Sequence, residues 1–163
     1  MANTLVESQL TLAHDTLKDI CGNISEYLNG TTLSDMLSED GQSDEEFFKA
    51  VLSSLRRVLV FCEEGKEASE VILNGKTFRK AAAEKTLYWI YHHCIEEFFN
   101  PRIDNWYEDS RSAYTGKNAI KFSKSVPNSL KDLMKTIEGP FQSIREELEY
   151  YETDFQTKMI HSK

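Results

Sequence analysis

Hydrophobic residues in the first thirty positions recur in alternating steps of four and three. The residues on this line are Val6, Leu10, Ala13, Leu17, Ile20, Ile24 and Tyr27. Such spacing places one apolar seam along an amphipathic helix, so the sequence predicts a helix over residues 4–28. Asn29 and Gly30 are a common helix stop, and we expect residues 31–43 to form a connector.

A second helix is predicted to begin at Ser43, because Ser43 with Glu46 three residues later matches a capping box. Its apolar seam contains Phe48, Leu52, Leu55, Leu59 and Cys62. Residues 66–78 allow two interpretations. The helix continues to a stop at Asn74 and Gly75, or these two residues form the type I′ turn of a β-hairpin. Helical spacing of the apolar residues after position 67 favours the helix.

The most apolar segment, residues 77–99, is predicted to be a third helix. It is apolar around much of its circumference, which is typical of a central helix. Asn100 and Pro101 are expected to end it. Residues 100–128 show no helical periodicity, so we expect a long irregular loop with a short hairpin near residues 115–118.

The last helix is predicted to begin after Pro127 and to keep one register through Gly139 and Pro140. Its apolar positions step by four and three along Leu130, Met134, Ile137, Phe141, Ile144, Leu148, Tyr151 and Phe155. Together these patterns predict an all-α fold, an antiparallel four-helix bundle with a long irregular loop between the third and fourth helices. The length suits a single domain over residues 1–163.

The chain is acidic, with 19 basic and 27 acidic residues and a net charge of −8. Such a charge is poorly suited to non-specific binding of nucleic acid or of anionic membranes. The N-terminal residues lack a basic segment followed by an apolar one, and no run approaches about 18 apolar residues. We therefore expect a cytoplasmic protein without a membrane span. Free, buried thiols are expected at Cys21, Cys62 and Cys94.

Two groups of residues resemble parts of known metal sites. His92 with Glu96 and His93 with Glu97 have i, i+4 spacing on the third helix, but neither Glu-x-x-His nor His-Glu-x-x-His is present. A second group, Glu63, Glu64 and Glu67, resembles half of the metal-binding motif of all-α nucleoside triphosphate pyrophosphohydrolases. Its second half, Glu-x-x-Asp, is missing from the next helix. We expect no metal site, no cofactor and no catalytic residue.

One stretch runs against the acidic composition. Between Arg111 and Lys131 the chain has five basic residues and no acidic one. Hydroxyls, a glycine and aromatic rings lie among or beside them, which suits a phosphate or carboxylate ligand. The candidate ligand-binding residues are Trp106, Tyr107, Arg111, Tyr114, Gly116, Lys117 and Lys121. The alternative is that the basic residues neutralise an acidic helix face of the same protein.

Three runs of the sequence are similar to the YpuI-like family, a group of uncharacterised cytosolic proteins from Gram-positive bacteria. The runs begin at Phe78 (FRKAAAEKTLY), at Trp106 (WYEDSRSAYTGKNAIKF) and at Ile144 (IREELEYYETD). This resemblance covers nearly the whole chain. It implies a bacterial cytoplasmic protein, and it carries no known activity, cofactor or catalytic residue.

The leading functional hypothesis is a non-catalytic binding or regulatory protein that uses the loop over residues 104–124. Its partner is then an unknown protein or a small anionic ligand, and nucleic acid is not expected. One alternative is a metal-dependent enzyme acting on a phosphorylated small molecule, with Arg111 and Lys117 as phosphate clamps. Another is a subunit of an obligate homo-oligomer, in which the apolar fourth helix packs against another chain.

Overall fold

The helices follow the apolar spacing of the sequence. A computed structural model describes residues 2–40, 44–111 and 118–155. Its helical elements are α1 (Asn3–Gly30), α2 (Leu33–Asp40), α3 (Glu45–Leu73), α4 (Lys80–Ile90), the π-helical turn η1 (Tyr91–Ile95), α5 (Glu96–Phe99), α7 (Asn128–Glu147) and the 3-10 turn η2 (Glu149–Tyr151). Two short strands are β1 (Trp106–Glu108) and β2 (Ile120–Phe122). The protein is mostly helical, as predicted.

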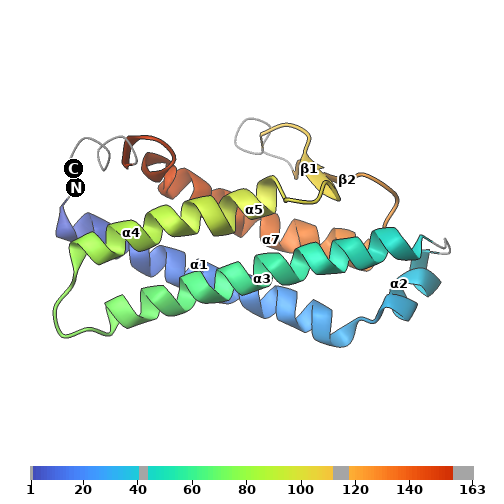
Figure 1. Ribbon diagram of the computed structural model, residues 1–163, viewed down its shortest axis with the longest axis horizontal. Coiled ribbons are helices and arrows are strands. Elements are labelled where there is room, and N and C mark those ends of the chain that lie inside the picture. The colour runs from blue at the N-terminus through green and yellow to red at the C-terminus, as the bar shows by residue number, and fades with distance from the viewer. Residues whose placement is uncertain (1, 41–43, 112–117, 156–163) are drawn as a thin grey trace.

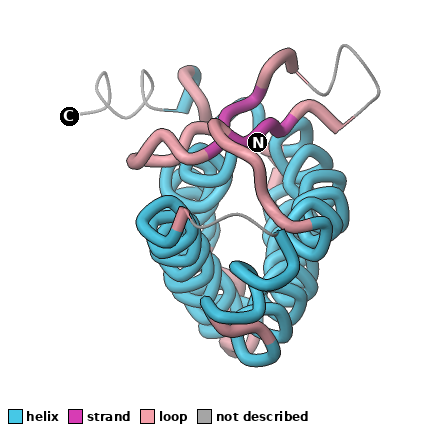
Figure 2. Tube along the Cα trace, turned by 90° about the vertical axis from the view of Figure 1, so that its right-hand side faces the viewer, coloured by secondary structure: helices cyan, strands magenta, loops and turns pink. Residues whose placement is uncertain are grey.

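The long helices pack around one hydrophobic interior. α1 contacts α3, α4 and α7, and α3 also contacts α4. Consecutive long helical segments run in opposite directions in Figure 1, and Figure 2 shows them from the end. The seam of α1 is fully buried from Val6 to Ile24, and the apolar residues of α7 belong to the same core. Among the described residues, no helix is both long enough and apolar enough to cross a bilayer.

Two helix starts differ from the predicted ones. Residues 33–40 form α2 instead of an irregular connector, because Thr32 and Asp35 cap each other. Thr32 N donates to Asp35 Oδ2 at 2.9 Å, and Asp35 N donates to Thr32 Oγ1 at 3.1 Å. The cap of α3 is Asp44, whose Oδ1 accepts a hydrogen bond from a backbone amide of the first turn at 3.1 Å. Ser43, the predicted cap, lies outside the described residues.

The helical interpretation of residues 66–78 is confirmed over the length of α3, and the hairpin interpretation is wrong. Asn74 has φ −87° and ψ −2°, whereas a type I′ turn needs positive φ there. Ile72 is buried, so the last turns of α3 are held by packing against the core. A polar contact adds to this, because His14 Nε2 on α1 lies 3.0 Å from Glu70 Oε1.

A π-helical turn interrupts the third predicted helix, whereas the fourth stays one α-helix across its proline. The third contains the π-helical turn η1, in which Glu96 N donates to Tyr91 O, five residues back. The fourth, α7, is one helix across Pro140, and Ile137 and Phe141 on either side of it are fully buried. The prediction of one unbroken register through Pro140 is confirmed.

The segment between α5 and α7 is not irregular throughout, because β1 and β2 pair in an antiparallel sheet. Trp106 lies opposite Phe122 in the register. The indole of Trp106 is fully buried, and its Nε1 donates to Phe98 O at 2.7 Å. Figures 1 and 2 both show the strands on one side of the helices. Most of the expected turn at 115–118 lies outside the described residues.

Candidate functional site

Two hollows flank the β1–β2 hairpin. The first, here called the lysine hollow, has a volume of about 520 Å³ and lies between β2 and the first half of α7. It is lined by Asn118, Ile120, Lys121, Phe122, Ser123, Lys124, Ser125, Val126, Lys131, Met134, Lys135 and Glu138. The second, here called the tyrosine hollow, has a volume of about 360 Å³ and is lined from η1, α5, β1 and α7, with Tyr91, Tyr107 and Arg111 among its residues. Both volumes are in the range of small-molecule sites.

Two buried side chains of α7 hold the hairpin in place. Glu138, 2% exposed, accepts hydrogen bonds from Ala119 N at 2.8 Å and Ile120 N at 3.3 Å. Arg145, 6% exposed, donates to both carboxylate oxygens of Glu108, at 2.9 and 2.7 Å. Glu138 and Arg145 are seven residues apart and therefore share one face of α7. Each strand is thus fixed to α7 by charge-assisted hydrogen bonds.

Two of the four lysines in the lysine hollow are paired with acidic residues. Lys121 Nζ lies 3.1 Å from Asp109 Oδ2. Lys124 Nζ lies 2.8 Å from Asp44 Oδ2. The Lys124 ammonium and the Phe47 amide hold the pKa of Asp44 below its usual value. The segment after β2 is thereby tied to the start of α3.

The other two lysines of the hollow are Lys131 and Lys135. The ammonium groups of Lys131 and Lys135 have no ion-pair or hydrogen-bond partner within residues 2–40, 44–111 and 118–155. Both residues are exposed and lie one turn apart on α7, where like charges destabilise a helix by about 0.2–0.5 kcal/mol. The hollow's apolar lining is formed by Ile120, Phe122, Val126 and Met134. It therefore combines two uncompensated positive charges with an apolar surface.

The predicted ligand-binding residues do not form one site. Lys121 lines the lysine hollow, whereas Tyr107 and Arg111 line the tyrosine hollow. Trp106 lines neither of the two hollows, and its ring is fully buried in the core. The remaining candidates lie outside the described residues and are Tyr114, Gly116 and Lys117.

Part of the basic stretch pairs with acidic groups of the same protein, although these groups lie on separate segments and not on one acidic helix face, as the alternative interpretation had it. Arg111 Nη2 lies 3.7 Å from Glu149 Oε1, and Lys121 and Lys124 have the pairs described above. Sequence reasoning missed Lys135, which follows the stretch that it singled out. The i, i+4 spacing of Lys131 and Lys135 was the signal that could have found it.

The two histidine–glutamate pairs of the third helix make contacts with protein groups. His92 Nδ1 lies 3.3 Å from Glu96 Oε1, and its Nε2 lies 3.0 Å from a backbone oxygen of η2. His93 stacks on Trp89 with ring centres 4.7 Å apart, while Glu97 binds a guanidinium of α3. The described residues contain no group of three or more His, Cys, Asp or Glu that could hold a metal ion. The expected free, buried thiols are confirmed at Cys21, Cys62 and Cys94.

The sequence of the chain matches a family model and a bacterial relative. The family model, described as a protein of unknown function (DUF3907), matches residues 10–157. The uncharacterized protein YpuI of Bacillus subtilis (strain 168) is 43% identical over 152 residues, which are 93% of this chain and 84% of that protein. No solved structure matches the chain. The resemblance to the YpuI-like family seen in the sequence is confirmed.

Proposed function

We propose that this chain, which belongs to the DUF3907 family of proteins of unknown function, is a non-catalytic binding protein for a small organic phosphate. The phosphate group contacts the ammonium groups of Lys131 and Lys135, and the organic part covers the apolar lining of the lysine hollow. The observation that carries this proposal is that the two ammonium groups have no anionic partner among the described residues.

The charges of the hollow favour a ligand with more than one negative charge. A phosphate monoester carries about −1.5 to −2 near neutral pH and offers three acceptor oxygens, so it can accept from two ammonium groups one helical turn apart. The one carboxylate of the hollow, Glu138, accepts hydrogen bonds from the backbone of β2 and the residue before it. A bound phosphate also removes the repulsion between Lys131 and Lys135.

The apolar lining favours an organic ligand over inorganic phosphate. Ile120 and Phe122 line the hollow and are half-buried, so covering them removes apolar surface from water. Inorganic phosphate uses the charges and leaves this surface exposed. We therefore expect the organic group to add affinity.

The two alternative hypotheses have less support. The metal-dependent enzyme required Arg111 as a phosphate clamp, but Arg111 lies near Glu149 and lines the other hollow. The oligomer subunit required an uncovered apolar face on α7, but the buried apolar residues of α7 belong to the core of the single chain.

Isothermal titration calorimetry with phenyl phosphate tests the proposal. The double variant Lys131→Gln/Lys135→Gln is expected to bind about tenfold more weakly or worse, because it removes two charge-assisted contacts. Its stability should change by no more than about 0.5 kcal/mol, since both positions are exposed. Inorganic phosphate is expected to bind the unaltered protein more weakly than phenyl phosphate.

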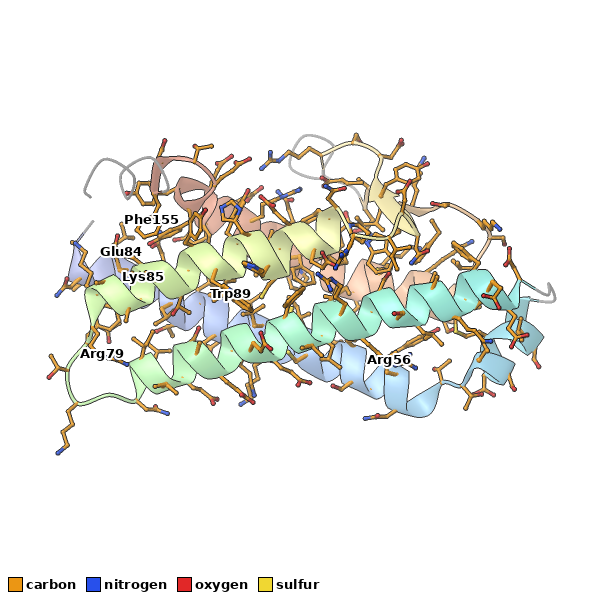
Figure 3. All side chains as sticks on the ribbon, in the orientation of Figure 1. Arg56, Arg79, Glu84, Lys85, Trp89 and Phe155 are labelled. Atoms are coloured by element: carbon orange, nitrogen blue, oxygen red, sulfur yellow. The ribbon has the colours of Figure 1, made fainter. Side chains whose placement is uncertain are left out.

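A matched control removes the same charge elsewhere. Lys76 and Lys85 are exposed, and Figure 3 shows Lys85 on α4, away from the hairpin. The variant Lys76→Gln/Lys85→Gln should bind phenyl phosphate like the unaltered protein. An equal loss of affinity in both double variants would show that the protein's net charge, and not the lysine hollow, governs phenyl phosphate binding. That result, or no binding at millimolar phenyl phosphate, contradicts the proposal.

A further inference from the structure

Tyr91 is a buried tyrosine whose hydroxyl has no hydrogen-bond partner in the part of the chain that the structure describes. Its side chain is 3% exposed, and it opens the π-helical turn η1. Leaving a buried hydroxyl unpaired costs about 1–3 kcal/mol, and π-helical turns within helices are frequent at functional sites. The unpaired hydroxyl is the first observation that points to a ligand.

Tyr91 lines the tyrosine hollow. Burial raises the pKa of Tyr91 to about 12, with smaller contributions from the charges of Glu152, Arg111, Glu96 and Arg145. All four of these charged residues line the tyrosine hollow, as Tyr91 itself does. Tyr91 and these four charged residues therefore border the same hollow.

Two charged groups of the hollow are already engaged. Arg145 donates to both oxygens of Glu108, and its guanidinium lies 3.6 Å from the centre of the Phe99 ring. Glu96 lies 3.3 Å from His92 Nδ1. These groups form the wall of the hollow.

Two other charged groups of the hollow remain available. Glu152 has no ion pair within the described residues. The ion pair of Arg111 with Glu149 is loose, because Nη2 lies 3.7 Å from Oε1, which is longer than a hydrogen bond. Most of its guanidinium donors are therefore unused. Within the described part of the chain, the hollow presents a hydroxyl without a hydrogen-bond partner, a carboxylate without an ion pair, and a guanidinium with one loose ion pair.

We infer that the tyrosine hollow binds a free α-amino acid as a zwitterion, separately from the phosphate ligand proposed for the lysine hollow. The ammonium group of the amino acid contacts the Glu152 carboxylate and the Tyr91 hydroxyl, and its carboxylate contacts Arg111. Three carboxylates against two guanidinium groups line the hollow, which disfavours a phosphate. A simple cation makes no favourable contact with the guanidinium of Arg111.

Calorimetry with the standard L-amino acids at millimolar concentration tests this inference. The tightest binder is then compared with its N-acetyl derivative, which lacks the ammonium group, and its methyl ester, which lacks the carboxylate. The free amino acid is expected to bind at least about tenfold more tightly than either derivative, because each has lost one charge. Equal binding of either derivative, or no binding of any amino acid, overturns the inference.

Variants assign the binding to the hollow. Tyr91→Phe should weaken amino-acid binding about fivefold to tenfold, without lowering the melting temperature, because the hydroxyl has no hydrogen bond to lose among the residues that the structure describes. Glu152→Gln should weaken binding about tenfold or more. Tyr150→Phe is the matched control, since Tyr150 is half-buried and does not line the hollow, and it should bind normally. Unchanged binding in Tyr91→Phe and Glu152→Gln, or a clear fall in the melting temperature of Tyr91→Phe, overturns the inference.

The proposals for the two hollows can be tested independently of each other. The Lys131→Gln/Lys135→Gln variant should keep amino-acid binding, and Tyr91→Phe should keep phenyl phosphate binding. Loss of amino-acid binding in the lysine variant would place both ligands in one hollow and overturn the inference.

Discussion

Replacing Gly65 with alanine tests how closely α1, α3 and α4 pack. Gly65 is buried inside α3. A Cβ atom there would lie 3.0 Å from Ile90 Cγ1, 3.2 Å from Leu17 Cδ1 and 3.3 Å from Cys94 Sγ. These neighbours belong to three different helical elements, and all three are fully buried. In a close-packed interior none of them has free space into which to move.

Two opposing effects set the size of the change that Gly65→Ala makes in the free energy of unfolding. Alanine in a helix interior is favoured over glycine by about 1 kcal/mol, whereas forcing an extra methyl group into a packed core costs about 1–3 kcal/mol. We expect Gly65→Ala to lower the free energy of unfolding by about 1 kcal/mol. Gly22 in α1 is the matched control, because a Cβ there meets nothing within 4 Å. Gly22→Ala should raise the free energy of unfolding by about 0.5–1 kcal/mol.

Urea denaturation followed by circular dichroism measures both variants, with the slopes compared to exclude a change in the denatured state. In melting temperature, each 1 kcal/mol corresponds to roughly 2–4 °C for a chain of this size. If Gly65→Ala stabilises the protein as much as Gly22→Ala does, the helices are not packed as tightly as these distances require, and the reasoning is refuted.

Three further predictions concern buried polar groups and thiols. Glu108→Ala leaves the buried Arg145 without its carboxylate partner, so it should lower the free energy of unfolding in urea by about 3 kcal/mol. Glu149→Ala removes the carboxylate of the exposed Arg111–Glu149 pair, and an equal effect of the two variants contradicts the prediction. Burial lowers the pKa of His14, but hydrogen bonds and charges from Asp15 on α1 and Glu70 on α3 outweigh this effect. The net result is that His14 has a pKa raised above the usual 6.5. Its stabilising contribution is therefore full below about pH 6.5 and is lost as the pH rises through the raised folded-state pKa; unfolding free energies across this range should lose that dependence in His14→Gln. A thiol reagent should label the native protein no faster than it unfolds, at Cys21, Cys62 and Cys94.

Local patterns in the sequence predicted the long helices, although α2 was missed. Apolar spacing predicted α1, the extent of α3 beyond Gly65, and the single register of α7 across Pro140. It also placed the three thiols in the core. This succeeded because a helix buries one face, and that requirement recurs every three or four residues along the chain. The reciprocal cap of Thr32 and Asp35 was equally local and was overlooked.

The candidate sites depended on contacts between residues far apart in sequence. The basic stretch suggested one anion site, but α7 fixes the hairpin through Glu138 and Arg145, and a hollow lies on either side. Acidic partners from distant elements decide which basic residues are paired, as Asp44 does for Lys124.

Composition and spacing by themselves determined that this chain forms apolar-faced helices and carries a basic segment within an acidic protein. Only the tertiary structure decided that Trp106 belongs to the core, that Lys131 and Lys135 have no partner among the described residues, and that the buried Tyr91 lines a polar hollow. The physical reason is that periodicity reports which face of a segment is buried, whereas the pairing of a charge or hydroxyl depends on which groups the fold brings within hydrogen-bond distance.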